Sequence, residues 1–197
     1  MVLFHPKRCL RKIVQWYEIT VFRAYCQSHH IRCIIGDNTR IKHCRVKSKI
    51  DGVLIIGANC TLHGALFCFY GSGGRIELKD RVYINAYPWA KVSFYVKDSS
   101  TISIGSDCLF SNTIDIATTD WHRISDVKGN ILNPEKDVNI GDHVWLGRKI
   151  IVCKGVSIPD NSVIGAGSVV TKSFDETNVI IAGNPAEIKK RGVRWKL

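Results

Sequence analysis

The side chains best suited to proton transfer in this sequence are its seven histidines. Imidazole titrates near neutral pH, so a histidine can take a proton from a hydroxyl group that is otherwise a poor nucleophile. His122 stands two residues after Asp120. Alternate residues of an extended chain share a side, so Asp120 could orient the His122 imidazole. A backbone carbonyl could do the same, and His122 could also be an ordinary loop histidine.

A six-residue period predicts the fold that must position such side chains. From Ile140 onward, an aliphatic residue falls at every sixth position and is often followed by glycine. These aliphatic residues are Ile140, Leu146, Val152, Ile158, Ile164 and Val170. A period of six fits neither one helix face nor an alternating strand, but it is typical of short strands joined by tight turns. The pattern predicts an all-β fold, a parallel β-helix of 18-residue triangular coils. An antiparallel β-sandwich with chance spacing is the alternative.

The rest of the chain divides around this β-helix. Residues 1–30 form an N-terminal helical segment, because apolar residues recur at helical spacing over 7–28. Residues 31–174 form the β-helix, which is interrupted by a protruding loop at 118–133. Residues 175–197 form a C-terminal cap and a basic tail, since the open end of a solenoid needs a cover.

Three motifs resemble the left-handed β-helix acyltransferases, the hexapeptide-repeat acetyltransferases that use acetyl-CoA. They are residues 140–147 (IGDHVWLG), 163–172 (VIGAGSVVTK) and 181–186 (IAGNPA). Residues 118–122 (TTDWH) resemble the loop that carries the catalytic histidine of that family. The resemblance is greatest to bacterial O-acetyltransferases of capsule or lipopolysaccharide sugars, including polysialic acid O-acetyltransferases. It is strong over residues 104–192.

The resemblance implies transfer of an acetyl group from acetyl-CoA to a sugar hydroxyl of a bacterial surface polysaccharide or its precursor. His122 would be the general base of a direct attack in a ternary complex. A covalent route through Cys153 is less favoured, because no base lies at a recognisable spacing from it. Relatives of this kind are homotrimers with active sites between neighbouring solenoids, so we expect a homotrimer.

Three further residues are candidates for the reaction site. Trp145 is too large for the narrow interior of a coil and should face outward, against the acceptor sugar or the thioester end of the cofactor. Gly147 could bring a backbone N–H close to the thioester oxygen and stabilise the tetrahedral oxyanion. Asn85 could contact the acceptor sugar. Subunit packing is the alternative for Trp145, and an ordinary turn is the alternative for Gly147.

A column of lysines predicts a site for phosphate groups. Residues 18 apart stack on successive coils about 4.8 Å apart, which places Lys154 beside Lys172 and, if the register extends so far, Lys136 beside Lys154. Stacked lysines repel, so a bridging anion such as the phosphates of CoA would stabilise them, whereas a solvated column is the alternative. The predicted cofactor-binding residues are Gly147, Arg148, Lys154, Ala166, Lys172, Gly183, Asn184 and Lys190.

The net positive charge of the chain favours anionic binding partners. The chain holds 28 Lys and Arg against 17 Asp and Glu, a net charge of +11. Such a charge suits acetyl-CoA and an acidic carbohydrate, and without a recognition motif we expect no nucleic acid. The basic N-terminal helix, with Trp16 and Tyr17, could lie on anionic lipid or could cap the first coil.

The sequence also bears on the compartment. The apolar start Met1–Phe4 ends at His5, which is too short for a secretory signal, and no apolar run is long enough to span a membrane. Eight cysteines form no C-x-x-C pair. We therefore expect a reduced cytoplasmic protein without disulfides or a metal, which could work at the inner face of the cytoplasmic membrane.

Other functions fit the same fold. One is a zinc site, as in the carbonic anhydrases of this fold, but only His122 and His143 are nearby candidates and their spacing does not resemble that arrangement. Another is a non-catalytic glycan-binding solenoid, which His122 together with Trp145 argues against. Within the enzyme interpretation, N-acetylation of an amino-sugar nucleotide is the alternative, because the sequence does not name the acceptor.

Overall fold

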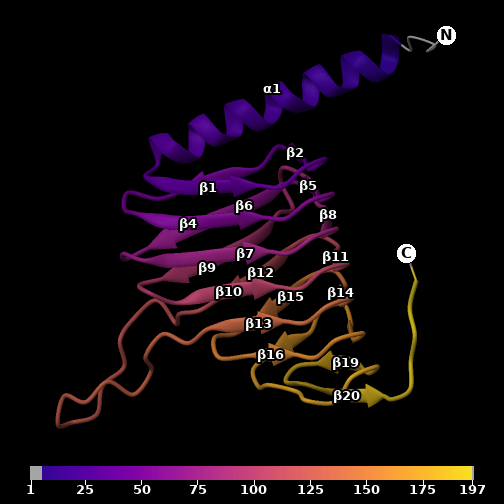
Figure 1. Ribbon diagram of the computed structural model, residues 1–197. Coiled ribbons are helices and arrows are strands. Elements are labelled where there is room, and N and C mark those ends of the chain that lie inside the picture. Colours follow the sequence, from indigo (N-terminus) through magenta and orange to yellow (C-terminus); the bar gives the residue numbers. More distant parts are fainter. Residues whose placement is uncertain (1–5, 197) are drawn as a thin grey trace.

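The computed structural model describes residues 6–196; the apolar start Met1–Phe4, His5 and Leu197 lie outside them. One helix, α1 (Pro6–Ser28), lies across one end of a stack of short strands (Figure 1). Successive strands join three sheets in turn, so that each coil gives one strand to each sheet. The predicted parallel β-helix, with an N-terminal helix and a protruding loop, is confirmed.

The three sheets are named A, B and C in the order in which the chain visits them. Sheet A holds β1 (Ile31–Ile35), β4 (Gly52–Ile56), β7 (Gly74–Leu78), β10 (Thr101–Ile104), β13 (Val138–Ile140) and β16 (Ser157–Ile158). Sheet B holds β2 (Arg40–Lys42), β5 (Thr61–His63), β8 (Tyr83–Asn85), β11 (Leu109–Phe110), β14 (Trp145–Leu146), β17 (Val163–Ile164), β19 (Ile180–Gly183) and β20 (Ala186–Lys190). Sheet C holds β3 (Arg45–Lys47), β6 (Ala65–Tyr70), β9 (Val92–Lys97), β12 (Ile114–Ala117), β15 (Ile150–Val152) and β18 (Val169–Val170). The pair β19–β20 is antiparallel and covers the C-terminal end of the stack.

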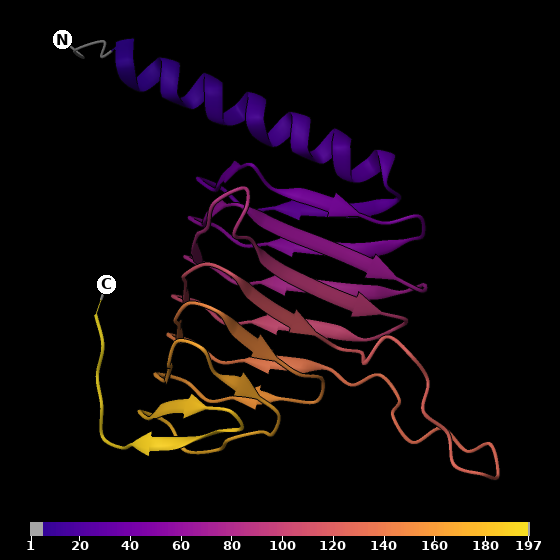
Figure 2. The same ribbon diagram turned by 180° about the vertical axis from the view of Figure 1, so that it is seen from behind.

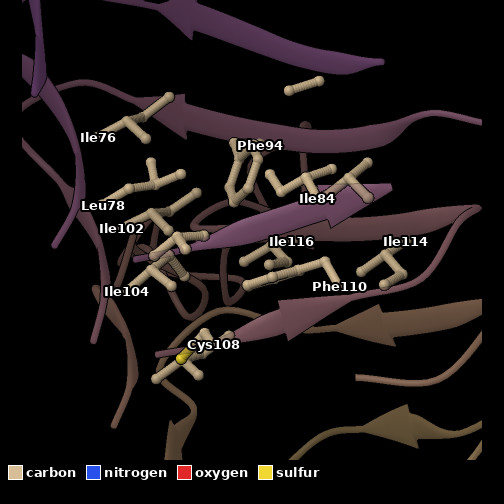
Figure 3. Close-up of a cluster of buried hydrophobic side chains, with 14 of the residues drawn as sticks. Ile76, Leu78, Ile84, Phe94, Ile102, Ile104, Cys108, Phe110, Ile114 and Ile116 are labelled. Atoms are coloured by element: carbon tan, nitrogen blue, oxygen red, sulfur yellow. The ribbon is translucent and has the colours of Figure 1, made fainter. Parts of the chain in front are cut away.

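The interior is filled by columns of apolar side chains, one behind each sheet. Strand pairing in sheet B aligns Ile84 with Phe110 and Phe110 with Leu146, and all three are fully buried. In sheet C, Phe67 stacks on Phe94 with ring centroids 5.3 Å apart. Figure 3 shows several of these side chains pointing into the interior. The aliphatic residue of each hexapeptide is therefore the core residue, and burying each one stabilises the fold by about 1.5–3 kcal/mol.

Coil lengths explain why only part of the sequence shows a strict period. Asn139 pairs with Ser157, eighteen residues later, whereas Ile31 pairs with Gly52, twenty-one residues later. Ile102 pairs with Val138, thirty-six residues later, because the protruding loop lies between them. Extra residues are accommodated at the corners between sheets, so the interior columns continue past them.

Thr39 joins the first two coils at the corner between sheets A and B. Its side chain is fully buried, and its Oγ1 donates to Gly57 O over 2.7 Å and accepts from Cys60 N–H at 3.1 Å. We expect Thr39→Val to lower the free energy of unfolding by about 1–3 kcal/mol, because two buried backbone groups lose their partner. Urea unfolding followed by circular dichroism measures this. The half-buried strand residue Thr61 gives the matched control, Thr61→Val, and an equally small loss in both variants would contradict the expectation.

The inner side of α1 covers the first coil. Phe22 and Cys26 are buried there. Gln15 Nε2 donates to Thr39 O, Arg23 Nη2 to Ile35 O and Tyr25 Oη to Val46 O. The helix is thus a cap on the stack, while its N-terminal part extends past the edge of the coils in both views (Figures 1 and 2). Across residues 6–196, no helix combines the length and the hydrophobicity that crossing a bilayer requires.

Candidate active site

His122 lies in the long loop between β12 and β13, which projects from the corner between sheets C and A (Figure 1). Its backbone is held on both sides. The His122 N–H donates to Asp120 O over 2.8 Å, and the His122 carbonyl accepts from Asn133 Nδ2 over 2.9 Å. The side chain is exposed, and no hydrogen bond among the described residues involves its ring. The loop therefore presents the imidazole to solvent from a fixed point of the backbone.

The residue before His122 anchors the base of the loop. Trp121 packs edge-on against Tyr70 and Tyr95 of sheet C, with ring centroids 5.1 Å apart in both pairs. Its backbone has a φ of 70°, and its N–H donates to Thr119 Oγ1 over 3.0 Å. A positive φ is uncommon for a bulky residue and marks a tightly constrained turn. The packed indole thus sets the position from which His122 projects.

Lys154, two residues after β15, closes the loop. Its Nζ lies 2.6 Å from Asp120 Oδ2 and donates to the carbonyls of Asn133, over 2.8 Å, and Pro134, over 3.0 Å. Only 13% of the Lys154 side chain is exposed. Lys154, and to a smaller extent Asn133, hold the pKa of the Asp120 carboxyl below its ordinary value despite the opposing effect of burial. Both ends of the loop are therefore fastened to one ammonium group.

These contacts differ from those predicted for two site residues. Asp120 is predicted to orient the His122 imidazole, whereas its carboxylate pairs with Lys154 and Asn133. Lys154 is predicted to bind a phosphate, whereas three oxygens of the loop already occupy the three donors that an ammonium has. The physical reason is that the coil register places Lys154 under the two ends of the loop. Lys172, one coil further along, is exposed and lies over the Phe174 ring at 5.8 Å.

Most other predicted cofactor residues gather at the corner between sheets B and C. The pairing of β14 with β17, and of β17 with β19, places Arg148, Ala166 and Gly183 on three successive coils. Ala166, Gly167 and Asn184 are exposed or face open space. This B–C corner is a row of small residues with room for an extended ligand. Arg148 stands at its rim and donates from Nε to Asn112 Oδ1 over 3.1 Å. Lys190 is exposed at the end of β20.

Gly147 does not offer the free backbone N–H that the predicted oxyanion contact needs. Its N–H donates to Ile164 O over 2.9 Å, within the hydrogen bonding between coils, so it is not available to an oxyanion. A Cβ at this position would lie 3.0 Å from Ala166 N. Glycine is needed here because the next coil approaches closely.

Trp145 faces outward from sheet B with 37% of its surface exposed. Trp195, from the C-terminal tail, packs against it with ring centroids 6.1 Å apart. Trp195 also stacks on His143 at 4.2 Å and donates from Nε1 to His143 O over 3.0 Å. The tail thus turns back along the stack, as Figure 2 shows, and supports one side of Trp145.

A hollow of about 340 Å³ beside Trp195 is lined by Asn59, Arg81, Val82, Tyr83, Asp107 and His143.

One chain does not bring His122 and Trp145 together. The loop leaves the stack between sheets C and A, whereas β14 belongs to sheet B. Both views show the loop on the side opposite to the C-terminal tail that packs on Trp145 (Figures 1 and 2). Asn85 ends β8 and is exposed on the same sheet as Trp145. The predicted residues therefore form two groups on different sides of the molecule.

An aromatic pair beside Asn85 was not predicted. Tyr87 and Trp89 lie in a short insertion at the B–C corner, with their rings stacked 5.2 Å apart, and Trp89 is 82% exposed. Stacked, solvent-facing aromatic rings suit contact with the apolar face of a sugar. The signal in the sequence is Tyr87-Pro88-Trp89, where two aromatics around a proline interrupt the early coils.

Cys153 borders a hollow of about 380 Å³ under the loop, together with Asp120 and Tyr95. Burial raises the pKa of its thiol, and the Asp120 carboxylate raises it further. A protonated thiol is a poor nucleophile. We therefore expect Cys153→Ser to keep about half or more of the wild-type kcat/KM for acyl transfer, measured as thiol release from the donor. A loss of activity to background would instead indicate a covalent route through Cys153.

Comparison with known proteins agrees with the fold of this chain. The family model "Hexapeptide repeat of succinyl-transferase" matches residues 137–172. The polysialic acid O-acetyltransferase of Neisseria meningitidis is 34% identical over 162 residues, covering 82% of this chain and 73% of that protein. The galactoside O-acetyltransferase of Escherichia coli (strain K12) is 29% identical over 133 residues, which is 68% of this chain. The match spans 61% of that relative, about three fifths of its length.

A solved structure of the polysialic acid O-acetyltransferase OatWY superimposes with a TM-score of 0.63 and 29% sequence identity. The match covers 85% of this chain and 88% of that one. The shared coils, the repeat motif and the similarity to the Neisseria enzyme agree with one another. The chain therefore belongs to the left-handed β-helix, hexapeptide-repeat acetyltransferase family.

Proposed function

We propose that this chain is an acetyl-CoA-dependent O-acetyltransferase that acylates a sugar hydroxyl of a bacterial surface polysaccharide, of the capsule or lipopolysaccharide kind, or of its precursor. The observation that carries the proposal is the fixed presentation of His122 on a projecting loop, away from Trp145 and the B–C corner of the same chain. The acceptor class is supported by the polysialic acid O-acetyltransferases among its relatives.

The complete site would lie between two chains of a homotrimer. The His122 loop of one chain would face Trp145 and the B–C corner of its neighbour. The projecting part of the loop carries several exposed aliphatic side chains, namely Ile124, Val127, Ile131 and Leu132. An apolar projection of this kind is stabilised when it packs against another chain. A closed ring of three chains repeats this contact three times.

The B–C corner fits an elongated, anionic acyl carrier. Acetyl-CoA would supply the acetyl group as an activated thioester. Ala166 leaves an open surface for its extended arm, and Gly183 and Asn184 continue this surface on the next coil. The exposed cations Arg148 and Lys190 would contact its phosphates, together with Lys172 at the neighbouring corner.

His122 would accept the proton of the acceptor hydroxyl while the hydroxyl oxygen attacks the thioester carbonyl. The carbon–sulfur bond would then break, and the imidazolium would return its proton to the departing thiolate. The products would be the O-acetylated sugar and free CoA. Trp145 would pack against the acceptor ring or the thioester end, and Asn85 with Trp89 would lie along the path of the acceptor.

Thiol release from acetyl-CoA tests this function. The acceptors would be neutral and acidic bacterial polysaccharides, their precursors and amino-sugar nucleotides. We expect release with a polysaccharide or precursor and a product that alkaline hydroxylamine cleaves, because esters react with it and amides do not. Release only with amino-sugar nucleotides, giving a hydroxylamine-stable product, would replace the proposal with N-acetylation. Failure to bind acetyl-CoA would overturn the enzyme proposal itself.

A further inference from the structure

The helix α1 carries an apolar surface on the side that it turns away from the coils. Gln15, Phe22 and Cys26 define the inner side, because they bond to the first coil or are buried against it. Ile13 and Tyr17 are each two positions from Gln15, so they lie about 200° around the helix axis from it. Their exposed fractions are 57% and 63%.

This outer surface is larger than a cap requires. Val14 and Trp16, each about 100° around the axis from Gln15, flank this surface, and Val21 adjoins it. All three are about half exposed or more, which gives five large apolar side chains within nine residues. The end cap of a solenoid normally has a polar outer face, because nothing covers it in a soluble chain. The packing of α1 on the first coil explains its inner side. Tyr17 and Val21 border an open hollow beside Ile41 and His43 of that coil, yet all five side chains remain about half exposed or more.

We propose that the outer surface of α1 docks on an anionic lipid bilayer. The helix sequence contains one acidic residue, Glu18, and five basic residues, of which four fall in its first seven positions. The basic residues are Lys7, Arg8, Arg11, Lys12 and Arg23. A helix with an apolar side, Trp and Tyr on that side and an excess of Lys and Arg is typical of binding in the plane of an anionic membrane surface. The same charge opposes pairing with the α1 of a second copy.

Docking through α1 leaves the sheets and the His122 loop free, because α1 lies at one end of the stack. In sheet B, β14 is the fourth strand beyond β2, and in sheet C, β12 is the third beyond β3. At about 4.8 Å per strand, the His122 loop and Trp145 would stand roughly 15–20 Å beyond the first coil. If the proposed acetyl transfer holds, this height suits a saccharide chain linked to a lipid of the same bilayer.

Vesicle flotation of the full chain tests the docking. The vesicles would contain phosphatidylcholine alone, or with about 30 mol% phosphatidylglycerol, at physiological salt. We expect the chain to float with the anionic vesicles and about tenfold less with the neutral ones. The double variant Ile13→Asp/Tyr17→Asp should lose about tenfold or more of the anionic binding. Trp16→Ala should weaken binding several-fold, whereas the control Ile151→Ala, at an exposed apolar residue of β15 four strands beyond β3, should not.

Thermal melting and acetyl-CoA binding would establish that the variants are folded, and Trp16→Ala serves if the double variant is not. Wild-type chain that stays unbound with anionic vesicles would overturn the proposal, as would equal binding by wild type and variants. Self-association in ultracentrifugation that the variants abolish, without vesicle binding, would assign the surface to a second copy instead. Because the measurement is binding, its failure leaves the proposed acetyl transfer untouched.

Discussion

Replacing His122 with alanine should lower kcat/KM for acetyl transfer by about 10²–10⁴-fold, because the acceptor hydroxyl would lose the proposed group that takes its proton. The affinity for acetyl-CoA and the free energy of unfolding should stay near the wild-type values. The reason is that the side chain is exposed and its ring makes no hydrogen bond within the described part of the chain. Initial rates of thiol release and calorimetric titration with acetyl-CoA would measure the two effects separately.

The matched control is Arg123→Ala, which removes the exposed neighbour of His122 in the same loop. It should stay within about threefold of wild type, since general-base catalysis depends on the imidazole alone. A His122→Ala variant that turned over at the wild-type rate would remove His122 from the mechanism. Equal losses in both variants would indicate that loop packing, rather than proton transfer, is affected.

Replacing Lys154 with methionine should lower kcat/KM by about 10–10²-fold through loss of the loop geometry. The substitution leaves the Asp120 carboxylate and the carbonyls of Asn133 and Pro134 without their shared donor. The Asp120 side chain is 43% exposed, so solvent screens this contact and its loss should cost only about 0.2–1 kcal/mol, through a loop that loosens and moves His122. Proteolysis within the loop should accelerate, while the affinity for acetyl-CoA should change little.

The exposed Lys172 gives the comparison, because Lys172→Met removes a predicted phosphate contact without touching the loop. We expect Lys172→Met to raise the KM for acetyl-CoA with kcat preserved, and Lys154→Met to lower kcat. The opposite pattern for Lys154→Met, weak acetyl-CoA binding with an intact loop, would return Lys154 to the phosphate site.

The contact of Lys154 with Asp120 also predicts a dependence on pH. The folded chain lowers the pKa of the Asp120 carboxyl, so the contact contributes fully above the ordinary value of about 4 and is lost as the pH falls through the lowered value. The difference in unfolding free energy between wild type and Lys154→Met should therefore be larger at neutral pH than in strong acid. Urea unfolding at both pH values would measure it. A difference that does not change with pH would contradict the assignment.

Much of the fold could be predicted from the sequence because the repeat is local. The alignment of Leu146 with Ile164, and of Val152 with Val170, follows directly from the eighteen-residue coil. The sequence alone does not align the early coils with one another as readily. Insertions such as the one carrying Tyr87 and Trp89 change the length of a coil without changing its core residues. Because the strands are short, the sequence identifies each one by its inward-facing residue. An insertion at a corner between sheets leaves that residue in the core.

The site was predictable only where a residue acts through its own type and exposure. The outward position of Trp145 followed from its size. The pairing of Asp120 with Lys154 joins residues 34 positions apart, and the stacking of Trp195 on His143 joins residues 52 apart. Such contacts depend on where the His122 loop lies along the stack and on the path of the C-terminal tail. Neither can be predicted from a local sequence pattern. The hydrogen bond of Gly147 was likewise a property of the neighbouring coil rather than of its motif.

The central claim is that one active site takes His122 from one chain and Trp145 from its neighbour, and mixed assemblies test it most directly. His122→Ala and Trp145→Ala chains, each expected to lose most of its activity alone, would be co-expressed with different tags and the mixed trimers purified. Each mixed trimer, whichever variant it holds twice, contains one contact in three that joins an intact loop to an intact sheet, so about a third of the sites would be restored. We predict thiol release from acetyl-CoA at about a third of the wild-type rate. Mixed assemblies as inactive as the separate variants would contradict a site shared between chains.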